Sequence, residues 1–93
     1  SVFKNRIMKK QIFYEVRVED NVDGEIIFNT YDFKTIGAAK NKMDEEKEVK
    51  SKWKDNCSKE DLYIEEEENS FFMQSEVDDY YTKIDILEKT FED

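Results

Sequence analysis

Strict alternation of apolar and polar side chains in residues 10–19 is the feature that most limits how this chain can fold. Every second position carries an apolar side chain, and these are Ile12, Tyr14, Val16 and Val18. Successive side chains of a strand point to opposite faces, so the pattern predicts a strand with one buried face. Residues 20–24 are rich in Asp, Asn and Gly, which predicts a tight turn centred on Asp23-Gly24.

The segment after this turn, residues 25–33, contains several β-branched and aromatic side chains. That composition predicts a second strand, which returns beside the first as an antiparallel hairpin. Residues 19–26, which include the turn, also resemble the start of a calcium-binding loop, with acidic, Asn, Asp and Gly residues at the expected spacing. Thr30 stands where that loop needs a bidentate Glu, so we favour the hairpin.

A long helix is predicted for residues 35–56, where Lys, Glu and Ala dominate and Pro is absent. Thr35 is a suitable N-cap residue. An apolar stripe at helical spacing consists of Ile36, Ala39, Met43, Trp53 and Cys57. Glu46 and Lys50 interrupt this stripe, so we expect the two ends of the helix to be more buried than its middle.

The last third of the chain predicts two or three further strands. Leu62 and Ile64 begin one that runs into the tetraglutamate stretch, residues 65–68, and residues 71–74 form another extended piece. Residues 80–91 alternate as a strand does, but Val77, Tyr80, Ile84, Leu87 and Phe91 also match a helical stripe. We favour the strand because Tyr, Thr and Ile are abundant in this segment, and the helix stays open as the alternative.

These elements predict an α+β fold, in which an antiparallel sheet of four to five strands carries one long helix on one face. The order is ββαββ or ββαβββ, within one domain that spans residues 10–93. Residues 1–9 form a basic segment, which we expect to be flexible or not native to the protein, because Met8 resembles a natural start. The uncovered sheet face is expected to carry Phe13, Tyr31 and Tyr81 and to be available to a partner.

Most enzymatic chemistry is unexpected for this sequence. It contains no His, which is the commonest general base and zinc ligand. The single Cys57 has no His to activate it, and two Gly residues are too few for a phosphate-binding loop. We therefore predict a protein that is not an enzyme, with no catalytic residue, no metal ligand and no cofactor. One cysteine and no long apolar segment also favour a cytoplasmic location.

Negative charge is concentrated near the C-terminus. Residues 58–93 contain 13 acids and three lysines, whereas the whole chain has a net charge of −9. Such a surface repels nucleic acids and membranes and attracts basic proteins, so the predicted partner is a basic protein surface. The predicted binding residues are the acids Glu65, Glu66, Glu67, Glu68, Asp78 and Asp79, with Phe72 and Tyr80 as aromatic anchors.

Two functions are consistent with these features. The first is an inhibitor that imitates nucleic acid and blocks a nuclease or another DNA- or RNA-handling protein. In size, acidity and lack of catalytic residues the chain is similar in type to phage-encoded anti-restriction and anti-CRISPR proteins, although it shares no motif with them. The second is a structural or regulatory accessory domain, in the form of a homodimer joined through sheet edges or the uncovered face, whose acids serve solubility.

Overall fold

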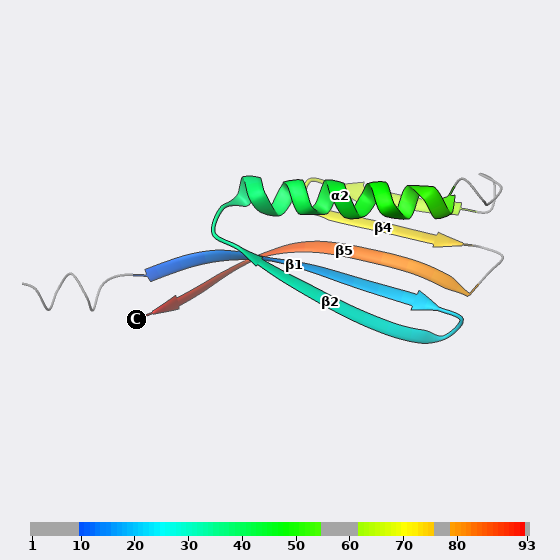
Figure 1. The fold of residues 1–93 in the computed structure, drawn as a ribbon, viewed down its shortest axis with the longest axis horizontal. Coiled ribbons are helices and arrows are strands. Elements are labelled where there is room, and N and C mark those ends of the chain that lie inside the picture. The colour runs from blue at the N-terminus through cyan, green and yellow to red at the C-terminus, as the bar shows by residue number, and fades with distance from the viewer. Residues whose placement is uncertain (1–9, 55–61, 76–78, 93) are drawn as a thin grey trace, which may run out of the picture.

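The computed structural model describes residues 10–54, 62–75 and 79–92, and the predicted basic segment at residues 1–9 lies outside them. The described residues form five strands and one long helix in the order ββαβββ (Figure 1). The elements are β1 (Lys10–Val22), β2 (Glu25–Phe33), α2 (Ile36–Lys54), β3 (Leu62–Glu67), β4 (Ser70–Ser75) and β5 (Tyr80–Glu92). The predicted α+β class, the five-stranded alternative and the single long helix are confirmed.

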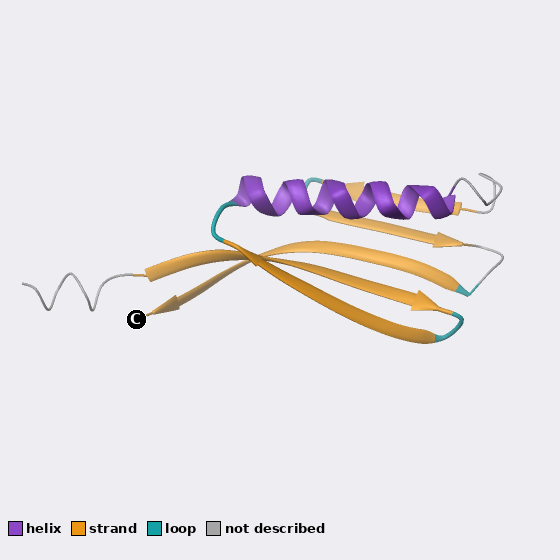
Figure 2. Ribbon diagram, viewed as in Figure 1, coloured by secondary structure: helices purple, strands orange, loops and turns teal. Residues whose placement is uncertain are grey.

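The strands form one sheet in the order β2-β1-β5-β4-β3, and every neighbouring pair is antiparallel. Antiparallel neighbours can be joined by short turns, and only the step from β2 at one edge to β3 at the other requires a long connection. The helix α2 makes that connection and lies across one face of the sheet (Figure 2). We call this side the helix face and the opposite side the open face.

The β1–β2 hairpin closes through a two-residue turn at the predicted position. Asp23 and Gly24 have φ angles of 53° and 88°, so both adopt the left-handed conformation that such turns need. The turn aligns Val22 with Glu25 and thereby sets the register of the whole hairpin. The amide of Asp23 also donates a hydrogen bond of 2.8 Å to the carbonyl of Asp79, which joins the turn to the start of β5.

The hydrophobic core lies between the helix face and α2. Its buried apolar side chains come from two central strands, from β4 and from the helix, and they are Val16, Val18, Ala39, Met43, Phe71, Met73, Ile84 and Ile86. In β5 every second side chain is buried, as in a strand with one covered face. The helical alternative for this segment is therefore wrong. Alternation sends Ile84 and Ile86 to the helix face together with the buried Thr82.

The helix begins at the predicted cap, where the Thr35 hydroxyl accepts a hydrogen bond of 3.2 Å from the amide of Ala38. Its first half supplies the buried Ala39 and Met43, whereas Ile36 is exposed. The side chain of Trp53 and the whole of Cys57 lie outside the described residues. Within the described part of the chain, no helix is long and apolar enough to cross a membrane.

Tyr31 lies on the helix face, so the expectation that it belongs to the open face was wrong. The hairpin register places Tyr31 opposite Val16, which is buried beneath the helix. The amino group of Lys42 lies 4.2 Å from the centre of the Tyr31 ring. Residue composition gave no indication of this, because the face of a β2 residue depends on the turn length. Phe13 and Tyr81 point to the side opposite the buried Val16 and Thr82 of their strands, so they occupy the open face.

A partly buried ion pair fixes the C-terminal part of α2 to the sheet. Lys50 Nζ lies 2.9 Å from Asp20 Oδ2, and the two side chains are only 16% and 13% exposed. This pair explains how Lys50, which interrupts the apolar stripe, is accommodated on the buried side of the helix. A charged group at such a site is tolerated because it has an opposite charge within contact distance.

Replacement of Lys50 by Met is expected to lower the free energy of unfolding by about 3 kcal/mol, since it leaves the Asp20 carboxylate without its cation. The double variant Asp20→Asn with Lys50→Met should recover much of this loss because no unpaired charge is left. Urea denaturation of the two variants and the wild type measures both effects. A Lys50→Met variant as stable as the wild type would show that the ion pair does not hold the helix.

Candidate partner-binding face

The open face is built by residues that alternate with the buried ones. Ile64 of β3 pairs with the buried Met73 of β4, so the residues on either side of them point away from the helix. The same alternation applies to β5, where Ile84 is buried. Together the three strands at this end of the sheet present on the open face Tyr63, Glu65, Glu67, Ser70, Phe72, Gln74, Tyr81, Lys83 and Asp85.

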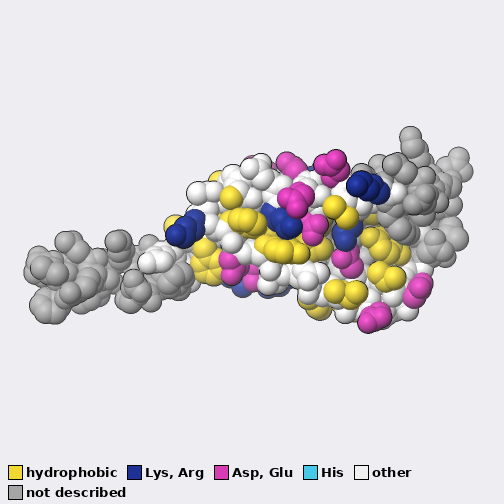
Figure 3. All heavy atoms as spheres, in the orientation of Figure 1, with side chains coloured by type: hydrophobic (Ala, Val, Ile, Leu, Met, Phe, Trp, Pro, Cys, Tyr) yellow, Lys and Arg dark blue, Asp and Glu magenta, His cyan; other side chains and the backbone are white. Residues whose placement is uncertain are grey.

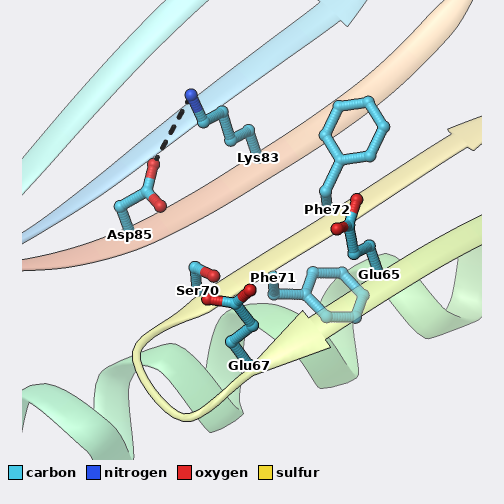
Figure 4. Close-up of a pocket in the computed structure, with 7 residues that line it drawn as sticks. All are labelled: Glu65, Glu67, Ser70, Phe71, Phe72, Lys83 and Asp85. Atoms are coloured by element: carbon cyan, nitrogen blue, oxygen red, sulfur yellow. Dashed lines mark ion pairs between the residues drawn. The ribbon is translucent and has the colours of Figure 1, made fainter.

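A hollow of about 370 Å³ lies among these side chains. Figure 4 shows that β3 contributes two glutamates, β4 contributes the Phe72 ring, and β5 contributes a lysine and an aspartate. The lining residues are Glu65, Glu67, Ser70, Phe71, Phe72, Lys83 and Asp85. Three carboxylates therefore surround a space that is bordered by an aromatic ring and contains one amino group of the protein itself.

The internal charge pairing of this hollow is weak. Lys83 Nζ lies 3.9 Å from Asp85 Oδ2, which is at the limit of an ion pair, and the lysine side chain is 52% exposed. Exposed pairs of this kind contribute about 0–1 kcal/mol. Glu65 accepts a hydrogen bond of 3.1 Å from the Tyr63 hydroxyl, and this bond raises the pKa of Tyr63. The carboxylates of the hollow are thus accessible to a cation from outside.

Three aromatic rings form a continuous surface beside the hollow. The centre of the Phe72 ring lies 5.9 Å from that of Tyr81 and 6.2 Å from that of Tyr63, the latter at an interplanar angle of 63°. The Tyr81 hydroxyl donates a hydrogen bond to Glu19 of β1, which raises the pKa of Tyr81 and holds its ring in place. Rings arranged in this way can stack against an arginine side chain as well as against each other.

The tetraglutamate stretch is divided between the two faces of the sheet. Glu66 alternates with Glu65 and Glu67, so it points to the helix face, where it forms an ion pair with Lys47. Glu68 lies in the β3–β4 turn, 3.0 Å from Lys40 Nζ. Helix lysines therefore neutralise two of the four glutamates, and the structure brings only the other two together with Phe72.

The remaining predicted site residues lie elsewhere. Asp79 accepts a hydrogen bond of 2.9 Å from Asn21 Nδ2, at the end of the sheet where the β1–β2 turn lies. Tyr80 packs partly buried against the core on the helix face, opposite Val22. Asp78 lies outside the described residues. The predicted residues therefore do not form a single surface, and Tyr80 contacts the core rather than the open face.

The predicted binding residues do not include Tyr63, Lys83 and Asp85, and Tyr81 was expected on the uncovered face but not among them. The alternation of β5 already separated its open-face residues from its buried ones, and this signal could have identified Tyr81 and Asp85. The sequence lacked a signal for the strand order, which brings β5 within reach of β3 across the short β4. Among the described residues, no group of three or more Cys, Asp or Glu side chains is arranged to hold a metal ion.

Comparison of the chain with protein-family models, curated proteins and solved structures found no match.

Titration of Tyr80 should reveal its position on the helix face. Burial, and secondarily the negative charge of Asp20, raise the pKa of Tyr80 to about 12. Its pKa is ordinarily near 10, so between about pH 10 and 12 the unfolded chain loses this proton more readily than the folded one. The stability that Tyr80 contributes is complete below pH 10 and is lost as the pH rises to 12. Urea denaturation across this range should show a smaller alkaline loss of stability for Tyr80→Phe than for the wild type, and equal losses would contradict this placement.

Proposed function

We propose that this protein is a binding module that receives a basic segment of another protein on its open face. The observation that supports this function is the hollow, which Glu65, Glu67 and Asp85 line together with the partly buried Phe72. Carboxylates bind arginine and lysine side chains, and an adjacent aromatic ring adds a favourable contact with a guanidinium group. The excess of negative charge on the whole chain would speed the approach of such a partner.

The spacing of the two glutamates suits an extended basic segment. Glu65 and Glu67 are two residues apart on one strand, which separates their positions by about 6.7 Å along the sheet. An extended peptide repeats its side chains at the same interval, so alternate arginines of a partner could each meet one carboxylate. We therefore expect recognition of basic residues at every second position, with the aromatic surface contacting the aliphatic parts of their side chains.

Imitation of nucleic acid by an inhibitor is a narrower form of this function and stays a prediction. It calls for carboxylates in rows, whereas helix lysines neutralise Glu66 and Glu68. The position of the carboxylates thus favours binding of a short basic segment of a partner over insertion of this protein into the partner's long phosphate-binding groove. Once a partner has been captured, competition with duplex DNA separates these two forms, because only a partner that uses its nucleic-acid site would be displaced.

Two matched double variants test the proposal. Glu65→Gln with Glu67→Gln and Glu66→Gln with Glu68→Gln remove the same charge from the same segment, but only the first pair lies on the open face, because Glu66 points to the helix face and Glu68 lies in the β3–β4 turn. The first pair should weaken binding of a labelled peptide in which arginine alternates with glycine by about tenfold, as two exposed ion pairs of ~0.7 kcal/mol each would give. The second pair should change this affinity little. Fluorescence anisotropy measures both affinities, and raised salt should weaken binding.

A further variant of the hollow should act in the opposite direction. Lys83 supplies the amino group beside Asp85, so Lys83→Gln should strengthen peptide binding by removing a competing cation. Amide chemical shifts in an NMR titration should change first at residues 65, 67, 72 and 85. Equal weakening by both double variants would indicate a general charge effect, and the proposed site would then be wrong.

A further inference from the structure

The two edges of the sheet differ sharply in chemistry. The β3 edge carries Glu65, Glu66 and Glu67 in succession, and charges at an edge repel other strands. The β2 edge carries Ile26, Ile27 and Phe28 in succession, with exposed fractions of 52%, 45% and 60%. Figure 3 shows apolar side chains exposed at the end of the molecule where the β1–β2 hairpin lies. One edge is thus protected against pairing and the other is not.

The β2 edge also presents backbone groups that can pair. In a hairpin with a two-residue turn, the residues that flank the turn exchange hydrogen bonds, and every second pair after them does the same. Val22 and Glu25 are the flanking pair here, so Ile27, Asn29 and Tyr31 direct their amides and carbonyls to β1. The alternate residues of β2 direct theirs outward, and these are Ile26, Phe28, Thr30 and Asp32. Within the described chain, β2 pairs with no strand other than β1.

We propose that β2 is a dimerisation edge and that its occupant is the β2 strand of a second copy of this chain. A two-fold axis through the apolar run, at Ile27 or Phe28, aligns two antiparallel β2 strands so that outward backbone groups meet outward backbone groups. The first axis places Ile26 opposite Phe28 of the second copy on the open face and Ile27 opposite its counterpart on the helix face. The second places Phe28 opposite its counterpart.

This self-complementarity is the reason for choosing a second copy as the occupant. Within residues 26–31 the strand carries no charge, and its two charged residues, Glu25 and Asp32, stand near its ends. With the axis at Ile27, apolar side chains meet apolar ones on both faces; with the axis at Phe28, Ile26 and Ile27 meet the uncharged Thr30 and Asn29. Neither alignment places an unpaired charge within the apolar run. A single strand-to-strand contact lies at or below the ~1,200–2,000 Å² that stable interfaces bury, so the dimer should dissociate on dilution.

Dimerisation is independent of the proposed binding of a basic partner. The β2 edge and the hollow lie at opposite ends of the strand order, so both can be occupied at once. Salt separates the two interactions, because it screens repulsion between two chains of net charge −9 and therefore strengthens the dimer. The same salt weakens attraction between the hollow and a basic peptide. Failure of one proposal leaves the other intact.

Sedimentation equilibrium over a range of protein concentrations and two salt concentrations tests the dimer. The wild type should change from monomer to dimer with rising concentration, and more readily at high salt. Ile27→Lys places a charge on the edge and should raise the dissociation constant by about tenfold or more. Ile64→Lys introduces the same charge at a partly exposed isoleucine of the opposite edge and should leave the dimer unchanged. A wild type that stays monomeric at every concentration, or a dimer disrupted only by Ile64→Lys, overturns the proposal.

Disulfide trapping locates the axis without depending on these charge variants. In a Cys57→Ser background, a cysteine at position 27 or 28 lies opposite its counterpart at ~4.5–5.5 Å between Cβ atoms when it is on the axis. One of these two variants should form a disulfide-linked dimer under mild oxidation, whereas Thr30→Cys should not. Linkage at position 30 alone, or at none of the three, would show that the apolar run does not lie at the axis.

Discussion

Pairing of β1 with β5 is the constraint on which the rest of the structure depends. These strands stand far apart in the sequence, yet they pair in register from Lys10 with Glu92 to Val22 with Tyr80. Each also pairs with a hairpin neighbour, β1 with β2 and β5 with β4, so their contact joins two local hairpins into one sheet. Without it, neither hairpin would present enough apolar surface for α2 to cover, because an isolated hairpin is marginally stable in water.

The helix then decides which acids of the sheet are available. Its lysines reach the helix face and the turn beside it, where they pair with Asp20, Glu66 and Glu68. On the open face, charge is balanced within the sheet near β1, where Glu15 lies 3.0 Å from Arg17 and 3.3 Å from Lys89. Around the hollow the balance is poorer, since three carboxylates share Lys83. Among the described residues of the open face, carboxylates without a close cation therefore gather at the β3–β4 end.

Local patterns in the sequence predicted local structure well. The turn at Asp23-Gly24, the bounds of the second strand and the cap at Thr35 all depend on residues close to one another in the chain, and all are confirmed. The strand predicted for residues 80–91 is confirmed as well, and its alternation places Asp85 on the face opposite Ile84 and Ile86. The face of Tyr31 was mispredicted, because register is a property of two strands and one turn together.

Strand order was the main property that the sequence could not provide. The predicted binding residues were chosen because they are close in sequence and similar in charge, but alternation and helix lysines divide them. Glu65 and Glu67 acquire Asp85 as a neighbour only because β4 lies between β3 and β5. Such contacts between distant segments depend on the whole sheet, and no short window of residues encodes them.

The contrast between the two sheet edges has a physical reason in this arrangement. Charged side chains on an edge strand oppose pairing with another strand, and the second half of the β3 edge, Glu65–Glu67, has that character on both faces. The helix does not cover the apolar run of the β2 edge, because the chain passes from the end of β2 at Phe33 into α2, which runs over the sheet toward the other edge. A run of three apolar residues left in that position lowers solubility unless another strand covers it. Pairing between two copies covers this run, because the outward backbone groups and apolar side chains of one β2 strand match those of the other. The acidic β3 edges of the two sheets then lie far apart.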